Sequence, residues 1–166
     1  MFWRKRPKVL LASLGMDALE FIRLRAAHTL ALAEFFAKIA TSGEERWFHP
    51  HRFTPEDAAR ICTYRGVDLF YGAVQEDRVL GYAMLRGWDE GFTTPSLGII
   101  VRQEARRLGL GTAFMHFLHA AARTRGATRV RLKVYHENVV AVALYERLGY
   151  VFEATNETQK VGYRTL

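Results

Sequence analysis

Two glycines, Gly109 and Gly111, stand where a long helix must begin, and this placement constrains the fold more than any other feature of the sequence. Glycine weakens a helix by about 1 kcal/mol relative to alanine. Here the glycines separate a strand-like segment, residues 93–101, from a segment whose apolar residues recur at helical spacing. Such a helix start exposes unpartnered backbone N–H groups, and glycine lets phosphate oxygens approach them. The sequence therefore predicts an anion site, with a structural turn beside solvated arginines as the alternative.

Helical spacing predicts a buried stripe on each of two helices. The first helix covers residues 26–43 and ends at Gly43, since glycine commonly terminates helices. The second begins at Leu110. The predicted stripes are Leu32, Phe35, Phe36 and Ile39 in the first helix, and Leu110, Ala113, Phe114, Phe117, Leu118 and Ala121 in the second.

The remaining pattern predicts an α/β domain in the order β-α-α-β-β-β-α-β-α-β-β. A short helix follows the N-cap Thr54, and another runs from the N-cap Asn138 to a stop at Gly149. Polar turns join three strand-like segments between residues 68 and 101, which predicts an antiparallel meander. We expect a mixed, mainly antiparallel sheet of six to seven strands flanked by about four helices. The other strands are expected at residues 19–24, 129–135, 150–156 and 160–166.

Length and composition limit the partners. The 166 residues are expected to form one domain at residues 17–166, preceded by a basic extension at residues 1–16. Cys62 is the only cysteine, which excludes an internal disulfide framework and a cysteine metal site, so we expect a reducing, cytoplasmic setting. No apolar run approaches the roughly 20 residues of a membrane span. The net charge of +7 favours an anionic partner.

Two nucleotide-binding motifs with paired glycines do not fit. A dinucleotide fingerprint needs a third small residue at position 114, where the sequence has Phe114. A P-loop needs Gly-Lys-Ser/Thr, which is absent from the sequence.

Two segments together resemble the GNAT N-acetyltransferase superfamily. "RRLGLG", from Arg106 to Gly111, resembles its Gln/Arg-x-x-Gly-x-Gly/Ala signature. "NVVAVALYERLGYVFE", beginning at Asn138, resembles its second signature, Asn-x-x-Ala-x-x-Leu-Tyr-x-x-x-Gly-Tyr/Phe. The resemblance covers roughly residues 17–166 and implies the GNAT fold, with acetyl-CoA as co-substrate and no metal.

The resemblance also implies a set of cofactor-binding residues. In the family, backbone N–H groups of the glycine loop hold the pyrophosphate, and the end of the fourth strand pairs with the pantetheine arm. The implied pyrophosphate residues are Arg106, Leu108, Gly109, Leu110, Gly111 and Thr112, and the implied pantetheine residues are Ile99, Val101 and Asn138.

Tyr145 is the predicted catalytic acid. It follows Asn138 by seven residues, about two helical turns, so the two side chains share a face. The resemblance implies that Tyr145 protonates the leaving CoA thiolate, which needs an acid or a hydrogen bond. The alternative is an ordinary N-cap at Asn138 and a packing role for Tyr145.

The general base is where the sequence departs from the resemblance. Several family members carry a glutamate early in the fourth strand, but residues 93–96 here contain no carboxylate. Glu90 in the preceding turn is the predicted base, and a water chain is the alternative. His49 and His51 are expected to be loop residues first and acceptor contacts second.

These features predict an N-acetyltransferase that moves the acetyl group of acetyl-CoA to a primary amine by direct attack in a ternary complex. The expected acceptor is a small molecule, with amino sugars as one candidate class. A non-catalytic module that binds acyl-CoA or nucleic acid is the alternative function. We expect no membrane partner, consider nucleic acid the weaker partner, and leave a homodimer open.

Overall fold

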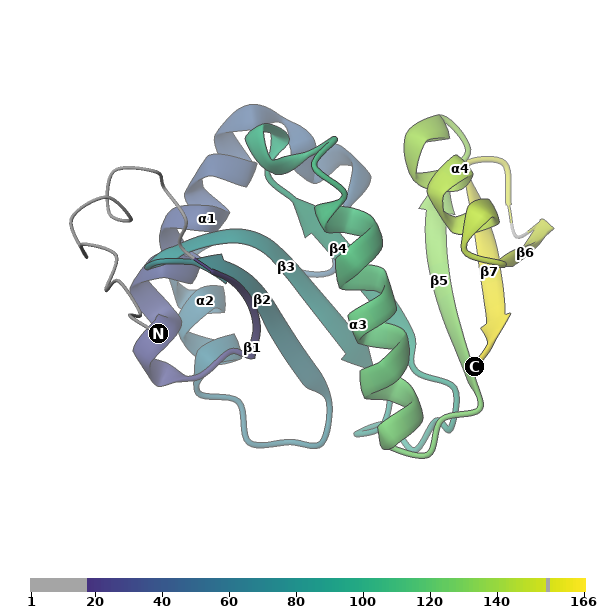
Figure 1. The fold of residues 1–166 in the computed structure, drawn as a ribbon, viewed down its shortest axis with the longest axis horizontal. Coiled ribbons are helices and arrows are strands. Elements are labelled where there is room, and N and C mark those ends of the chain that lie inside the picture. The colour runs from purple at the N-terminus through teal and green to yellow at the C-terminus, as the bar shows by residue number, and fades with distance from the viewer. Residues whose placement is uncertain (1–17, 155) are drawn as a thin grey trace, which may run out of the picture.

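The computed structural model describes residues 18–154 and 156–166, so the predicted basic extension at residues 1–16 lies outside the described residues. One seven-stranded sheet organises the molecule (Figure 1). Its strands are β1 (Leu19–Arg23), β2 (Leu69–Gln75), β3 (Arg78–Arg86), β4 (Ser96–Val101), β5 (Arg129–Tyr135), β6 (Val151–Ala154) and β7 (Gln159–Thr165). The helices are α1 (Thr29–Ser42), α2 (Pro55–Cys62), α3 (Leu110–Thr124) and α4 (Val139–Arg147), with short 3-10 turns η3 (Ala26–His28), η4 (Glu44–Trp47) and η5 (Gln103–Ala105).

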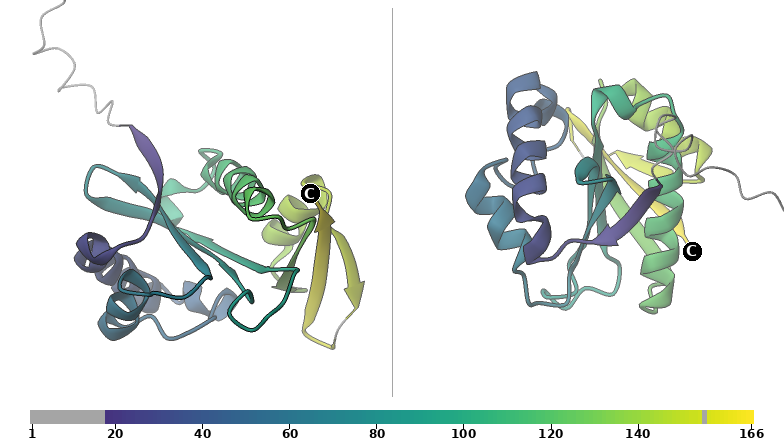
Figure 2. Two further views of the ribbon diagram at one scale, coloured as in Figure 1. Left: turned by 90° about the horizontal axis from the view of Figure 1, so that it is seen from below. Right: turned by 60° about the vertical axis from the view of Figure 1, so that its left-hand side comes forward.

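The strand order across the sheet is β1-β2-β3-β4-β5-β7-β6. Every neighbouring pair is antiparallel except β4 and β5. Helices α1 and α2 lie on one face, and α3 and α4 lie on the other (Figure 2). The predicted element order and the mixed, mainly antiparallel sheet are confirmed.

Local sequence signals set the helix ends as predicted. Gly43 ends α1 in the left-handed conformation, with φ of 72°. Thr54 begins α2 by accepting a hydrogen bond from the backbone N–H of Asp57. Asn138 begins α4 by accepting one from the N–H of Ala141. The Thr54 and Asn138 side chains each partner a backbone N–H that the first helical turn would otherwise leave unpaired.

The two buried stripes have different outcomes. The α1 stripe is confirmed, because its four predicted residues are the buried ones. The α3 stripe was wrong in part: Ala113 is exposed, while Phe117 and Ala121 are half-buried. Helix α3 packs against the sheet, α4 and Tyr150 together, so its buried surface is rotated from the predicted stripe. The buried residues of α3 are Leu110, Phe114, Met115, Leu118, His119 and Ala122.

The sheet is covered unevenly. Strands β2 and β3 are buried on both faces. The successive residues Tyr82 and Ala83 of β3, which point to opposite faces, are both fully buried. On β5, Val130 and Leu132 are buried beneath α3. The alternate β5 residues face the α1 and α2 side but lie beyond those helices, so Arg129 and Lys133 are exposed. Helices long and apolar enough to cross a membrane do not occur in the described ranges.

Candidate functional site

A seam divides the sheet between β4 and β5. These strands pair at one position only, Ser96 opposite Arg131, and the Arg131 N–H donates to the carbonyl of Pro95 at 3.0 Å. From that point the strands diverge, and the ribbon shows the two parts of the sheet standing apart (Figure 1). Strand β4 keeps its full pairing to β3, and β5 keeps its full pairing to β7. The edge of β4 toward Ile99 and Val101 therefore faces the opening.

The glycine turn lies at the open end of the seam, directly after β4. Gly109 is the N-cap of α3 and has φ of 79°, a conformation that side chains rarely adopt. Gly111 is different, because a Cβ added there would meet only Leu144, at an ordinary contact distance of 3.8 Å. Packing among the described residues therefore does not require glycine at position 111. Its cost to the helix points to a ligand that must approach the backbone.

Most of the predicted pyrophosphate residues present free backbone donors. Leu110, Gly111 and Thr112 form the first turn of α3, where N–H groups have no intrahelical acceptor. Leu108 is 80% exposed, beside this turn. Arg107 also adopts a left-handed conformation, with φ of 63°, which costs energy for a non-glycine residue and occurs most often at functional sites.

Arg106 differs from the other predicted pyrophosphate residues. Its backbone N–H donates to the carbonyl of Gln103 at 3.2 Å, so this group is already used. Its Nε donates to the carbonyl of Val101 at 3.1 Å, and its guanidinium forms an ion pair with Glu44. Arg106 thus ties the end of β4 to the turn after α1 and sets the shape of the loop. Direct phosphate contact by Arg106 stays a prediction.

Tyr145 lies on α4, next to Leu144, which is the side chain that a Cβ on Gly111 would meet. Its side chain is buried, with 8% exposed, and its ring lies 5.7 Å from that of Tyr150. Burial raises the pKa of Tyr145 to about 12. The hydroxyl has no hydrogen-bond partner among the described residues. Tyr145 therefore keeps its proton and can donate it to a group that enters the seam.

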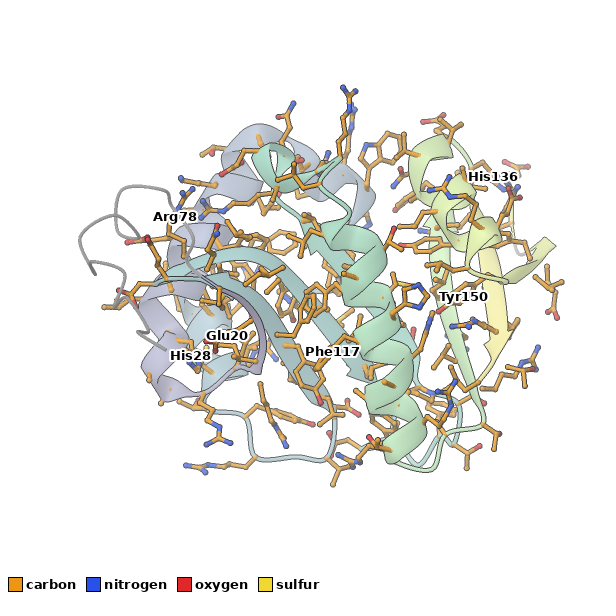
Figure 3. All side chains as sticks on the ribbon, in the orientation of Figure 1. Glu20, His28, Arg78, Phe117, His136 and Tyr150 are labelled. Atoms are coloured by element: carbon orange, nitrogen blue, oxygen red, sulfur yellow. The ribbon has the colours of Figure 1, made fainter. Side chains whose placement is uncertain are left out.

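A hydrogen-bonded chain supports the wall behind Tyr145. His119 of α3 contacts the Tyr150 hydroxyl through Nε2 at 2.8 Å, and its Nδ1 contacts the guanidinium of Arg164 on β7. Arginine can only donate, so Nδ1 of His119 accepts and Nε2 carries the proton. Figure 3 shows Tyr150 at the junction between α3 and the β5 side of the sheet. This chain joins α3, β7 and the end of α4 beside Tyr145.

The segment after α1 crosses the seam on the α1 and α2 face. Phe48 lies over β4, since a Cβ on Gly98 would come within 2.7 Å of its ring. The next residue, His49, bonds the hydroxyl of Tyr135 at the end of β5 at 2.8 Å. The ring of Trp47 lies 5.9 Å from that of Tyr135. These contacts bridge the two parts of the sheet and give Trp47 and Phe48 a packing role.

Asn138 is confirmed as an N-cap, its side-chain oxygen accepting from Ala141 at 3.3 Å. The amide nitrogen of Asn138 has no bonded partner among the described residues, so it remains able to donate. The capping role of Asn138 is therefore compatible with a contact to the pantetheine arm, and that contact stays a prediction.

Glu90 lies between two open cavities and contributes to the lining of both. One has a volume of about 440 Å³ and lies at the closed end of the seam, beside Ser96 and Arg131. The other has about 400 Å³ and lies beside α2, lined by His51 and Asp68 among others. Glu90 is exposed and reaches toward both volumes, which suits a group that receives a proton from an acceptor amine.

Two aspartates hold the turn that carries Glu90. Buried Asp68 accepts hydrogen bonds from the backbone N–H groups of Gly87 and Trp88, each at 2.9 Å. Asp89 accepts in return from the N–H of Val67 at 3.0 Å. The sequence alone indicated only turn residues here. The long-range brace explains how an exposed turn can present Glu90 in a fixed position.

His51 is a second group that could accept a proton. Its Nδ1 lies 2.7 Å from the carbonyl of Arg52, which makes Nδ1 the protonated nitrogen, and its Nε2 accepts from the buried Tyr82 hydroxyl at 3.0 Å. Burial lowers the pKa of His51, so the ring is neutral near pH 7. Because Tyr82 occupies the Nε2 lone pair, His51 suits a positioning role better than proton transfer.

Sequence reasoning missed two arginines at the closed end of the seam. Arg86 of β3 and Arg131 of β5 lie on the two sides of Ser96 and line the larger cavity. Strand alternation in "RVRLKVY" placed Arg131 on the polar face, but nothing local indicated that β3 would bring Arg86 to the same row. The signal becomes readable only once the strand register is known.

The split sheet, the glycine-started helix at its open end and the buried tyrosine beside it define an acetyltransferase fold. The chain belongs to the acetyltransferase (GNAT) family, whose model matches residues 30–150. The predicted resemblance is thereby confirmed. Within the described ranges, no group of three or more His, Cys, Asp or Glu side chains is placed to hold a metal ion.

Individual proteins agree with this assignment. The uncharacterized N-acetyltransferase YobR of Bacillus subtilis (strain 168) is 40% identical over 52 residues, which are 31% of this chain and 21% of that protein. The match thus spans about a fifth of the relative. A GCN5-related N-acetyltransferase from Kribbella flavida has 25% identity and a TM-score of 0.75, covering 90% of this chain and 98% of that one.

A second similar structure contains coenzyme A. RimL, a ribosomal L7/L12 alpha-N-protein acetyltransferase in complex with coenzyme A, has 14% identity and a TM-score of 0.75. The likeness covers 91% of this chain and 95% of RimL, and it shows a common fold.

Proposed function

We propose that this protein transfers the acetyl group of acetyl-CoA to a primary amine of a small molecule, by direct attack in a ternary complex. The observation that carries the proposal is the seam. Two further observations support the proposal: the glycine turn begins α3, and Leu144 of the second signature segment lies beside Gly111, next to the buried Tyr145. Family membership supports acetyl transfer, and the CoA complex of RimL supports CoA as the carrier.

The residues present fit a CoA-borne acetyl group. N–H groups at the start of α3 would receive the pyrophosphate, where the helix dipole favours negative charge. The free edge of β4 at Ile99 and Val101 would pair with the amide-bearing arm as an added strand. The acetyl group would then lie farther along β4 from the glycine turn, close to the cavity that Glu90 helps to line.

Each reacting group has an assigned role. Glu90 accepts a proton from the acceptor amine, directly or through water, which leaves the amine lone pair free to attack the acetyl carbonyl. Tyr145 donates to the sulfur as the carbon–sulfur bond breaks. Because the pKa of Tyr145 is about 12, above the roughly 8.5 of a thiol, a hydrogen bond to the forming thiolate is the main stabilising contribution.

The burial of Cys62 favours direct attack by the amine over a mechanism with a covalent acetyl-enzyme. It is buried in α2 between α1 and the sheet, away from the seam. Burial raises the pKa of the Cys62 thiol, so the nucleophilic thiolate is scarce at neutral pH. No other cysteine is present in the sequence.

The decisive experiment follows CoA thiol release from acetyl-CoA across a panel of amines, with the acetylated product identified by mass. We expect amine-dependent release. CoA binding without release for any amine would overturn catalysis and favour the acyl-CoA-binding alternative. Binding to nucleic acid in place of CoA would favour the second alternative that the net charge of +7 leaves open.

A matched pair of variants tests the glycine turn. Gly111→Glu and Gly111→Gln add side chains of equal size where the packing leaves room, but only glutamate places a negative charge at the helix start. We expect CoA binding by calorimetry to be lost with glutamate and to be weakened less with glutamine. Equal, near-native affinity in both folded variants would exclude the pyrophosphate assignment.

A further inference from the structure

The closed end of the seam carries positive charge that the chemistry proposed above does not use. Arg86, Ser96, Arg131 and Tyr163 occupy one row across β3, β4, β5 and β7, as the strand registers show. All four line the cavity of about 440 Å³. Neighbouring strands lie about 4.8 Å apart, so the Cα atoms of the two arginines are roughly 10 Å from each other. Both arginines therefore border one small volume.

Neither arginine forms an ion pair with a described residue, although Arg86 also lines the second cavity with Asp68, Asp89 and Glu90. The ion pairs among the described residues involve other arginines, namely Arg60, Arg78, Arg102 and Arg106. The Nε of Arg131 is buried and has no hydrogen-bond partner. A buried donor without a partner costs roughly 1–3 kcal/mol. A ligand that accepts from Arg131 would remove this cost.

The face of β5 beside the cavity carries two further basic side chains. Arg129 and Lys133 lie on the same uncovered face of β5 as Arg131, and Arg129 stacks over Tyr163 at 4.0 Å. Glu90 is the only carboxylate among the cavity-lining residues. The cavity therefore combines one proton acceptor with two unpaired guanidinium groups.

The cavity is separate from the predicted pyrophosphate site. Ser96 is the first residue of β4 and Val101 is the last, so the strand separates the cavity from the glycine turn by about 17 Å. The arginines thus lie at the acceptor end of the seam, where phosphates held at the start of α3 do not reach.

We propose that Arg86 and Arg131 bind an anionic group of the acceptor, so that the preferred substrates are amines that also carry a carboxylate or a phosphate. Guanidinium groups bind both anions in the same bidentate manner. The threonines and Ser96 in the lining supply neutral hydrogen bonds, and Met84 and Phe92 supply an apolar wall. This inference rests on the proposed function and specifies its acceptor.

The test compares pairs of amines that differ in one anionic group. Suitable pairs are glucosamine 6-phosphate with glucosamine, 4-aminobutyrate with its amide, and a short peptide whose second residue is glutamate with the same peptide carrying glutamine. Rates are compared at equal concentrations of free amine. We expect the anionic member of at least one pair to have the higher kcat/KM, by about 10- to 100-fold, as charged hydrogen bonds provide.

Variants connect that preference to the two arginines. Arg86→Gln and Arg131→Gln should each remove most of the preference by raising the KM of the anionic amine, with kcat little changed. Arg131→Lys should keep part of the preference for the anionic amine, because lysine retains the positive charge but cannot bind an anion in the bidentate manner of a guanidinium group. Arg78→Gln is the matched control, since Arg78 lies at the far end of β3 and pairs with Glu104 at 3.5 Å. Thermal unfolding confirms that each variant is folded.

Three outcomes overturn the inference. Equal rates within every pair, or a preference for neutral amines or polyamines, would remove the anionic acceptor while leaving acetyl transfer intact. A preference that survives both glutamine substitutions would place the anion site elsewhere. Absence of CoA release with any amine would overturn the proposed function and this inference together. The pair that shows the effect identifies the anionic group of the acceptor as a carboxylate or a phosphate. It also shows whether the acceptor is a free small molecule or the end of a peptide.

Discussion

The two parts of the sheet are built differently. Strands β1 to β4 are paired continuously and covered on both faces, by α1 and α2 on one side and by α3 on the other. Strands β5, β7 and β6 have helices on one face only, and their other face carries Arg129, Arg131 and Lys133. Within the sheet, strand pairing joins the two parts at one position, Ser96 with Arg131, and the segment that carries Trp47 and His49 bridges them from outside the sheet. We expect the covered part to contribute most of the free energy of unfolding, and the proposed site lies in the open part and the seam.

This difference follows from residue periodicity. "DLFYGAV" and "VLGYAML" are apolar at successive positions, as strands buried on both faces must be. "RVRLKVY" alternates, so one face of β5 is left polar. A fully buried β5 would close its second face with helices, and the acceptor would have no route to the seam. The four predictions below separate stability in the covered part from function at the seam.

The largest expected effect is on catalysis at the seam. Tyr145→Phe removes the hydroxyl and keeps the ring that packs against Tyr150. We expect kcat to fall by about 10²- to 10⁴-fold, the usual contribution of a general acid, with little change in KM for acetyl-CoA. The measurement is steady-state kinetics with the best amine found.

The pH profile gives an independent check on Tyr145. Because burial raises its pKa to about 12, the wild-type rate should not decline through tyrosine ionisation at or below about pH 10.5. Near-native turnover of Tyr145→Phe, with chemistry shown to be rate-limiting, would make Tyr145 a packing residue and assign the acid to water or another group.

The second prediction concerns stability in the covered part. Phe36 is fully buried and its ring contacts those of Phe53 and Tyr82 at 5.1 and 5.3 Å. Phe36→Ala should lower the free energy of unfolding by about 3–5 kcal/mol. Val151→Ala on β6, where the side chain is 73% exposed, should change it by less than about 0.5 kcal/mol. Denaturant unfolding measures both, and similar losses would contradict the division of roles.

The secondary structure could be predicted from the sequence because its signals depend on neighbouring residues. The helix caps at Thr54 and Asn138, the stop at Gly43 and the α1 stripe each depend on residues within a few positions of one another. The α3 stripe was partly wrong because several elements pack around that helix. A periodicity argument assumes one buried face, and His119 is buried by Tyr150 and Arg164, which lie far along the chain.

The site was predictable only where a motif carried it. The two signatures predicted the glycine turn and Tyr145, and the structure brings the two segments together where Leu144 lies beside Gly111. The roles of the glycine turn and of Tyr145 stay predictions. The Glu44–Arg106 ion pair and the Arg86–Arg131 row depend on strand register and on a crossing loop. Single-sequence patterns contain neither. Glu90 was chosen for its position before β4, and its role as base stays a prediction.

The third prediction concerns His119, which is hydrogen-bonded to Tyr150 and Arg164. Burial is the main cause that lowers the pKa of His119 from 6.5 to about 4, with Arg164 adding to it. Between these values the unfolded chain binds a proton that the native protein does not, so stability falls as pH decreases. The full effect, reached near pH 4, is about 3 kcal/mol. His119→Gln removes this titration.

The measurement is the free energy of unfolding of wild type and His119→Gln from neutral to acid pH. The variant starts less stable, because it loses the shape of the imidazole between Tyr150 and Arg164, but its deficit should shrink as pH falls from about 6.5 to 4. His116→Gln, at an exposed position on the same helix, controls for removal of a histidine. A deficit that stays constant with pH would mean that His119 has the same pKa in the native and unfolded states.

The smallest expected effect compares the N-caps of the two parts. Thr54 caps α2 in the covered part, accepting from Asp57 at 3.2 Å, and Asn138 caps α4 beside the seam, accepting from Ala141 at 3.3 Å. Thr54→Ala and Asn138→Ala should each cost about 1 kcal/mol of stability, because each leaves one backbone N–H without its acceptor. Thermal unfolding measures both losses.

Asn138→Ser separates capping from cofactor binding. Serine caps about as well as asparagine, so stability should be restored, but serine lacks the amide nitrogen that would reach the pantetheine arm. If Asn138 has both roles, the serine variant should be as stable as wild type and show a KM for acetyl-CoA raised about 3- to 10-fold, the value of one hydrogen bond. Thr54→Ser should leave that KM unchanged. A native KM in Asn138→Ser would restrict Asn138 to capping, and the backbone of β4 and the glycine turn would then bind the cofactor without it.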